Sequence, residues 1–177
     1  MKYGFGIDLR GTPVKIAYLD ENGTMLDKWE IPTRTENGGE SVLSDIASSI
    51  REKLTERAIA AQAVEGIGIG VPGPVDGDFT VHKCVNLGWG VLNLKKAMND
   101  LLPEIPNVAA GNDANVATLG ELWKGGGKGR RSAVMVTLGT GVGGGVVVDG
   151  RIVAGCNGGA GELGHITVEP AETVPCA

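Results

Sequence analysis

The sequence contains little cysteine and no long apolar run, and both absences narrow the class of protein. Its three cysteines, Cys84, Cys156 and Cys176, are an odd number at irregular spacing, which argues against a disulfide framework and favours a reducing compartment. No apolar run approaches the length of a membrane span, and the first residues lack the charged and apolar segments of a signal peptide. We therefore expect a cytoplasmic protein that does not enter a membrane.

An excess of positive charge is also lacking. The formal net charge is −5, and the one basic cluster, Lys124 with Lys128, Arg130 and Arg131, is interrupted by glycine. We expect a solvated loop there, and no nucleic-acid or membrane partner. The chain does contain 42% hydrophobic residues, enough for a real core, and 30 glycines. Because the glycines lie between apolar runs and form no periodic array, they indicate the turns of an enzyme-like α/β protein.

Apolar periodicity predicts a strand-rich start followed by alternating helices and strands. Strands are expected at 2–8, 14–19, 25–31, 64–71 and 108–110. Helices are expected at 41–57, at 93–102 and from Asn112-Asp113 onward. This order predicts an α/β fold in which an antiparallel meander opens a mixed sheet with helices on its faces. Alternating glycines in 64–71 indicate that a helix packs closely against that strand.

A glycine-rich linker at 124–131 is expected to separate two lobes. Residues 1–123 would form an N-terminal α/β lobe. Residues 132–177 would restart the same pattern without finishing it, with paired strands at 132–138 and 145–148 and a third at 151–154. We therefore expect the second lobe to be truncated.

The stretch 138–145, LGTGVGGG, is the richest in glycine. Glycine lets a ligand touch the main chain, and consecutive backbone N–H groups form a nest for an anion such as phosphate. Gly139, Gly141 and Gly144 fit the spacing G-x-G-x-x-G, but a dinucleotide-binding turn opens a helix. Here a β-branched run, 146–148, follows, so the stretch predicts a strand, a turn and a strand. From these residues alone, a tight hairpin without a ligand is an equally good interpretation.

Five motifs follow one another along the chain: Asp8-Leu9-Arg10-Gly11-Thr12, Gly70-Val71-Pro72-Gly73-Pro74-Val75-Asp76, Asn112-Asp113-Ala114-Asn115, Leu138-Gly139-Thr140-Gly141-Val142-Gly143-Gly144-Gly145 and Gly161-Glu162-Leu163-Gly164-His165. In this order and spacing they resemble the ROK family of repressors and sugar kinases, most closely its bacterial glucokinases. The resemblance implies an actin-like, ribonuclease-H-like ATPase fold of two lobes, with ATP and a sugar bound between them.

The resemblance implies an ATP site built from two turns. Asp8 would hold Mg²⁺, usually through water, because a hard cation prefers oxygen ligands. Gly11 and Thr12 lie in the same turn, where Thr12 would bond a phosphate oxygen. The opposite side would be formed by Gly139, Thr140, Gly141 and Gly143. Arg10 departs from the family, which usually has glycine there, and three interpretations stay open: it adds a cation to the phosphates, it points outward, or it blocks the nucleotide.

Asp113 is expected to be the base that takes the proton from the attacking sugar hydroxyl. From its position alone, Asn112 or Asp113 would more often cap the helix than act in catalysis. The resemblance makes the catalytic role the preferred one. It also implies a set of sugar ligands: Asn86, Asn112, Asp113, Glu162 and His165. Carboxylates and amides suit sugar hydroxyls because they accept, or both donate and accept, hydrogen bonds. Glucose is the first choice of substrate, with transfer to its 6-hydroxyl, and other hexoses use the same set.

In the family, His165 would also be the first ligand of a zinc site, and Cys176 would be the second. The other two cysteines of that site are absent, and structural zinc needs four ligands, so we expect this chain not to hold Zn²⁺. Because the second lobe is expected to be truncated, we also expect low kinase activity. The alternative is a non-catalytic sugar-binding or sugar-sensing protein. Repressors of the family carry a DNA-binding region ahead of the first strand, for which this sequence has no room. A homodimer is expected by analogy with the family.

Overall fold

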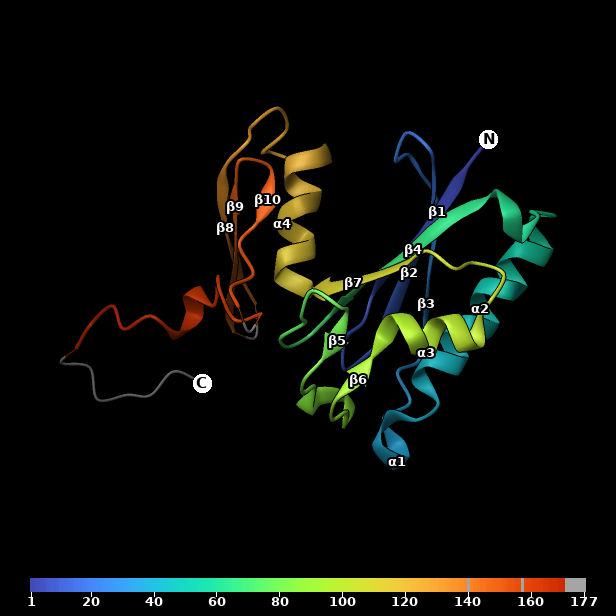
Figure 1. Cartoon of the computed structure of the whole chain (residues 1–177), viewed down its shortest axis with the longest axis horizontal. Helices are drawn as coiled ribbons and strands as arrows, with labels where there is room; N and C mark the ends of the chain where they lie inside the picture. Colours follow the sequence, from blue (N-terminus) through green and yellow to red (C-terminus); the bar gives the residue numbers. More distant parts are fainter. Residues whose placement is uncertain (140, 157, 171–177) are drawn as a thin grey trace. The chain divides into compact units, whose positions relative to one another are not determined.

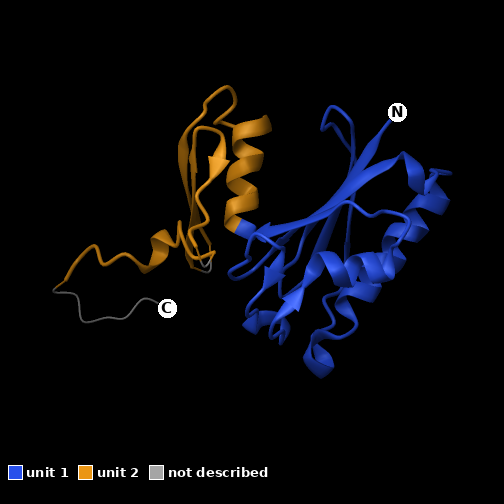
Figure 2. Cartoon of the chain, in the orientation of Figure 1, with its two compact units in different colours: residues 1–113 blue, residues 114–177 orange. Residues whose placement is uncertain are grey.

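A computed structural model of the chain describes residues 1–139, 141–156 and 158–170 (Figure 1). The chain packs as two compact units, Met1–Asp113 and Ala114–Ala177 (Figure 2). Within the described residues, no helix is both long enough and apolar enough to cross a membrane.

The first unit is built on a mixed, five-stranded sheet in the order β3-β2-β1-β4-β7. Strands β1 (Tyr3–Asp8), β2 (Val14–Asp20) and β3 (Met25–Ile31) form the antiparallel meander. Strands β4 (Val64–Val71) and β7 (Val108–Asn112) run parallel to β1. The predicted α/β fold with a mixed sheet is therefore confirmed.

Two helices pack together against this sheet. Helices α2 (Val42–Glu56) and α3 (Leu94–Leu101) contact each other, and α3 also contacts β7 (Figure 1). Apolar side chains of these helices are buried in the core, among them Ile46, Ile50 and Met98. Burying each such side chain stabilises the fold by roughly 1.5–3 kcal/mol. Asn93 is the N-cap of α3, and its side-chain oxygen accepts a hydrogen bond from the Lys96 N–H at 2.7 Å.

Several short elements of the first unit are not evident from the sequence. They are α1 (Glu36–Gly39), β5 (Thr80–Val81), β6 (Leu92–Asn93) and the 3₁₀ turns η1 (Ala61–Ala63) and η2 (Val85–Leu87). Strands β5 and β6 pair in antiparallel fashion. Elements of two to four residues are too short to display a hydrophobic period.

One packing expectation for β4 is wrong. The nearest atoms to a Cβ added at Gly66 belong to Asn107, with the Asn107 carbonyl oxygen at 2.5 Å. Asn107 also donates from its side chain to the Glu65 carbonyl at 2.8 Å. Gly66 therefore admits the backbone that leads into β7, and not a helix.

The second unit contains a β-hairpin and a helix. Strands β8 (Ala133–Leu138) and β9 (Val142–Val148) pair in antiparallel fashion, and β10 (Arg151–Ile152) follows on the other side of β9. The expected strand, turn and strand are confirmed, although β9 begins earlier than predicted because its glycines continue the ladder. The remaining elements are α4 (Asp113–Lys124) and the 3₁₀ turn η3 (Leu163–His165).

Gly145 of β9 lets α4 approach the hairpin. A Cβ added at Gly145 would overlap the side chain of Thr118, which is fully buried, whereas one at Gly143 would make an ordinary 3.7 Å contact with Ala114 Cβ. By packing, α4 belongs with the hairpin. The functional lobes expected from the sequence, 1–123 and 132–177, stay a prediction.

One face of β8 is exposed, and its Val136 lies opposite Gly144 of β9. Val134, Val136 and Leu138 alternate along the strand and are 65%, 54% and 82% exposed. Strand β8 is also the last strand in the order β10-β9-β8 among the described residues.

Candidate functional site

Three parallel strands of the first unit end at the same edge of the sheet. In the register of the sheet, Asp8 at the end of β1 lies opposite Gly70 of β4, and Asn112 at the end of β7 lies opposite Val71. The carboxyl ends of parallel strands are where open α/β sheets bind their ligands. Asp113 comes directly after β7, so both acidic residues predicted for the site in this unit lie at this edge.

Two hydrogen bonds hold the loops at this edge. The Leu9 N–H donates to the Gly70 carbonyl at 2.8 Å, which extends the ladder beyond β1. The Asn112 side chain donates to the Gly73 carbonyl at 3.3 Å, which joins the end of β7 to the turn after β4. Asn112 and Asp113 are both partly buried. Asn112 therefore makes a defined structural contact besides its predicted role as a sugar ligand.

The turn after β1 carries a salt bridge. Arg10 Nε lies 2.7 Å from the Asp8 carboxylate, and the Arg10 side chain is 60% exposed. The hydroxyl of Thr33, which follows β3, donates a hydrogen bond to the Arg10 carbonyl at 2.9 Å and so links this turn to the end of β3. A Cβ added at Gly11 would lie 3.9 Å from Asn86 Cβ, so the predicted phosphate turn and a predicted sugar ligand are neighbours. Thr12 follows and is exposed.

Asn86 lies on a short loop with alternating burial. It sits in η2, between the buried side chains of Cys84 and Leu87, and is itself exposed. Burial raises the pKa of the Cys84 thiol, and the negative charge of Asp113 adds to the rise.

A pocket of about 370 Å³ opens beside this loop. Its lining residues are Pro72, Gly73, Pro74, Lys83, Cys84, Val85 and Asn86. The pocket thus combines the turn that ends β4 with the loop that carries Asn86. Lys83 also lines this pocket, and the sequence analysis gave it no role.

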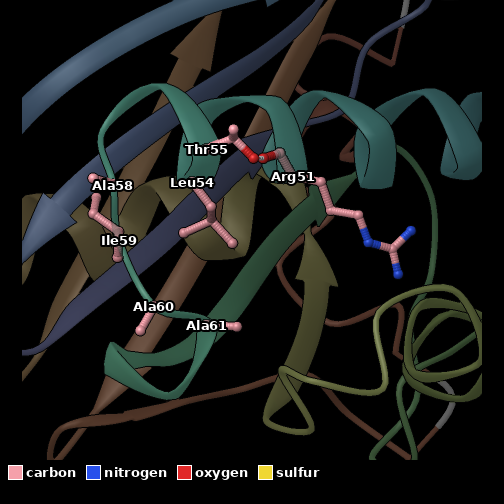
Figure 3. A pocket seen from close by; sticks show the side chains of 7 residues that line it. All are labelled: Arg51, Leu54, Thr55, Ala58, Ile59, Ala60 and Ala61. Carbon is pink, nitrogen blue, oxygen red and sulfur yellow. Dashed lines mark hydrogen bonds between the residues drawn. The ribbon is translucent and has the colours of Figure 1, made fainter.

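Another pocket, of about 440 Å³, lies at the end of α2 and holds none of the predicted site residues (Figure 3). Its lining is mostly aliphatic: Arg51, Leu54, Thr55, Ala58, Ile59, Ala60 and Ala61. Arg51 is engaged elsewhere, donating to the Leu101 carbonyl and to Glu104 at 2.6 and 2.9 Å. A ligand site needs polar groups that converge on the ligand, so we do not consider this pocket a candidate.

The second unit carries the predicted glycine turn. Gly139 and Gly141 are exposed, and a Cβ added at either would meet no described atom within 4 Å. Packing does not require glycine at these two positions, which agrees with a ligand approaching the main chain. Gly143 differs, because its added Cβ would lie 2.7 Å from the Thr137 hydroxyl. Thr140, predicted to bind phosphate, lies outside the described residues.

The turn η3 carries the two remaining predicted sugar ligands. Glu162 precedes the turn and His165 ends it, with the His165 N–H donating to the Glu162 carbonyl at 3.2 Å. Side chains three residues apart are aligned in a 3₁₀ turn, and both side chains are exposed. Leu163 packs over Gly144 of β9 and so anchors the turn on the hairpin.

No zinc site can be built from the described residues. They contain no group of three or more His, Cys, Asp or Glu side chains able to hold a metal ion. Cys84 is buried and Cys156 exposed, and neither forms a disulfide. Cys176, the other predicted zinc ligand beside His165, lies outside the described residues.

The predicted residues thus fall into two groups, each built on its own unit. The first unit brings together Asp8, Arg10, Gly11, Thr12, Asn86, Asn112 and Asp113 at the carboxyl edge of its sheet. The second unit carries Gly139, Gly141, Gly143, Glu162 and His165 on its hairpin and the turn packed against it.

Known proteins are similar to this chain in both sequence and architecture. The chain is 43% identical over 172 residues to a glucokinase from Halalkalibacterium halodurans, covering 97% of this chain and 52% of that protein. A crystal structure of a ROK family glucokinase from Streptomyces griseus with glucose and AMPPNP superposes with a TM-score of 0.80 at 31% identity, covering 95% of this chain and 51% of the other. The chain spans about half the length of these relatives.

A ROK family transcriptional regulator shares the fold as well, with a TM-score of 0.81 at 24% identity, covering 96% of this chain and 42% of the other. The actin-like ATPase fold of ROK sugar kinases is therefore the fold of this chain. Residues 4–177 match the sequence model of the ROK family, so the chain belongs to the ROK family.

Proposed function

We propose that this chain is part of an ATP-dependent hexose kinase, with glucose as the first-choice substrate and its 6-hydroxyl as the attacking group. The observation that supports the proposal is that Asp8 and Asp113 lie at one carboxyl edge of the sheet, with Asn86 beside Gly11 of the adjoining turn, in a chain similar to glucokinases. A phosphate turn, a sugar ligand and a candidate base are what direct phosphoryl transfer requires at one place.

Asp113 acts as the general base in this proposal. Its carboxylate accepts the proton of the sugar hydroxyl as the hydroxyl oxygen attacks the γ-phosphate. Asp113 opens α4, where the helix dipole favours the charged carboxylate. Asn86 and Asn112 orient the sugar by donating to and accepting from neighbouring hydroxyls, and Glu162 and His165 supply further hydrogen bonds. Holding the hydroxyl in line with the phosphate is most of the catalytic task.

The triphosphate is held by backbone N–H groups and cations. Gly11 and Thr12 offer the first turn, and Gly139, Thr140 and Gly141 the second. Asp8 has carboxylate oxygens that suit Mg²⁺, although Arg10 pairs with that carboxylate in the structure. Bound Mg²⁺ would neutralise charge on the phosphates.

A non-catalytic, sugar-sensing role is the second candidate, and one observation favours it. The Arg10 guanidinium lies on the carboxylate that a kinase would use for its metal. A protein that only binds sugar needs Asn86, Asn112 and Asp113 but not a metal-binding carboxylate. In both candidates the partner is a small-molecule sugar. A homodimer and a cytoplasmic location stay predictions.

The two candidates are separated by measuring sugar binding and phosphate transfer on the 177-residue chain. Calorimetric titration with glucose is expected to show binding, and Asn86→Ala to weaken it at least about tenfold, since a polar substrate group then loses its partner. Long incubation with ATP, Mg²⁺ and glucose, followed by ³¹P NMR, is expected to show slow formation of glucose phosphate.

Asp113→Asn tests the proposed base. This variant keeps a side chain that can bond the sugar, so glucose affinity is expected to change only a few-fold while glucose phosphate disappears. Asp100→Asn is the matched control, because it removes a carboxylate from the exposed surface of α3. Glucose binding without any transfer in the unsubstituted chain would favour the sensing role. A chain that binds no hexose would contradict both.

A further inference from the structure

Two loops of the first unit interlock behind Asn86. The Trp89 indole N–H donates to the Gly39 carbonyl at 3.2 Å, and Trp89 and Gly39 are both buried. A Cβ added at Gly88 would lie 3.0 Å from Gly38 Cα. We call this contact between residues 38–39 and 88–89 the clasp. It joins segments that are far apart in the sequence, the end of α1 and the loop that follows η2.

The clasp depends on glycine in a specific way. Gly38 and Gly39 have φ angles of 72° and 69°, values that favour glycine over residues with a side chain. A Cβ at Gly39 would overlap the Leu87 carbonyl and lie 2.8 Å from Trp89 Nε1. A Cβ at Gly38 would lie 3.7 Å from the Gly88 carbonyl, an ordinary contact. The backbone of residue 39 is therefore pressed against the Asn86 loop, and only hydrogen fits between them.

The loop itself is closed at its base. The Cys84 N–H donates to the Trp89 carbonyl and the Trp89 N–H to the Cys84 carbonyl, both at 3.0 Å. Leu87 is fully buried, while Asn86 beside it is exposed and neighbours Gly11. Residue 89 thus forms both the base of the loop, through its backbone, and the clasp, through its side chain. A displacement of Trp89 would be passed directly to Asn86.

We infer that Trp89 and Gly39 are positioning residues that hold Asn86 at the orientation needed for sugar binding. The inference rests on the proposed function for its sugar-binding consequence. The clasp keeps the loop in one arrangement before the ligand arrives, so that binding energy is not spent on ordering it. Where only a fraction of molecules has the competent loop, the apparent affinity falls by that fraction.

Trp89→Phe tests the clasp by removing the indole N–H while keeping an aromatic side chain. Trp29→Phe is the matched control, because Trp29 also donates its indole N–H, to the Ser49 hydroxyl at 2.7 Å, on a distant part of the same unit. We expect Trp89→Phe to weaken glucose binding about three- to tenfold, the effect of one lost neutral hydrogen bond. Trp29→Phe is expected to leave glucose affinity unchanged.

Gly39→Ala tests the same contact from the other loop, with Gly38→Ala as its control. Both substitutions place alanine at a positive φ, but only the one at residue 39 meets the Asn86 loop. Gly39→Ala is therefore expected to weaken glucose binding more than Gly38→Ala, and to lower the melting temperature more, because only its Cβ overlaps the loop. Circular dichroism melts identify variants that remain folded at the assay temperature.

Hydrogen–deuterium exchange of the peptide covering residues 84–89 gives a readout that does not need sugar. Exchange in this peptide is expected to speed up in Trp89→Phe and not in Trp29→Phe. If the unsubstituted chain binds no glucose, the proposed function fails, and the exchange result alone decides the clasp. Unchanged exchange in Trp89→Phe would overturn the clasp. Faster exchange with unchanged glucose affinity would overturn the positioning role.

Discussion

Replacing Arg10 with alanine separates a structural role of this side chain from a role in binding nucleotide. Its partner in the structure is Asp8, at 2.7 Å, and the two side chains are 60% and 34% exposed. Ion pairs at such exposed positions contribute about 0–1 kcal/mol to stability, because water and salt screen them. For a chain of this size, the melting temperature of Arg10→Ala should therefore fall by no more than about 4 °C.

The expected effect on nucleotide binding is larger. A hydrogen bond between a charged donor and a charged acceptor contributes about 1.5–3 kcal/mol, which corresponds to a roughly 10- to 150-fold change in dissociation constant. The assay is calorimetric titration with AMPPNP and Mg²⁺ at low salt. Because the interaction is electrostatic, the difference between Arg10→Ala and the unsubstituted chain should shrink as salt is raised.

Lys15→Ala is the control, since Lys15 forms an exposed pair with Glu30 on the neighbouring strands. It should affect neither nucleotide affinity nor stability by much. An unchanged AMPPNP affinity in Arg10→Ala would refute the phosphate-binding role. A tighter affinity would instead support the interpretation in which Arg10 blocks the nucleotide.

Three further predictions concern stability. Gly66→Ala should destabilise the first unit by about 1–3 kcal/mol in urea unfolding, because its Cβ would press on the Asn107 carbonyl. Gly145→Ala should lower the melting temperature of the hairpin unit, because its Cβ would overlap buried Thr118. Backbone hydrogen bonds, of which the one from Thr80 has the largest effect, lower the pKa of Asp76 below its ordinary value of 3.8. The Asp76 carboxylate therefore stabilises the fold fully above pH 3.8, and this stabilisation is lost as the pH falls from there toward the lower pKa of the folded state. Asp76→Asn should flatten that part of the acid unfolding curve.

Gly77→Ala is the control for the two glycine substitutions, because its Cβ would meet no described atom within 4 Å. Equal losses of stability in all three variants would show that backbone freedom, and not the close contacts, determines the effect. For Asp76, an acid unfolding curve that is identical in Asp76→Asn would contradict the linkage.

Much of the first unit could be predicted because its hydrophobic period is long and regular. Ile46, Ile50 and their neighbours on α2 repeat at helical spacing, and all are buried. A strand after Gly139 and Gly141, in place of a helix, was also predictable, because β-branched residues follow where a dinucleotide-binding turn would open a helix.

Tertiary contacts account for what the sequence did not reveal. Gly66 admits the backbone at Asn107, and Gly39 admits the loop that ends in Trp89; both contacts join segments far apart in the chain. The pairing of Arg10 with Asp8 was one arrangement among several for a flexible, exposed side chain. Local pattern carries no information about which distant atom occupies the space beside a glycine or a guanidinium.

The exposed row of Val134, Val136 and Leu138 has a practical consequence for all of these titrations. Because this row lies on β8, the last strand in the order β10-β9-β8 among the described residues, we expect the chain to self-associate through it. If the associated and the dissociated chain bind the ligand with different affinity, mass action makes the measured affinity depend on the protein concentration. Dissociation constants obtained at several protein concentrations, extrapolated to dilution, are the values that describe the site itself.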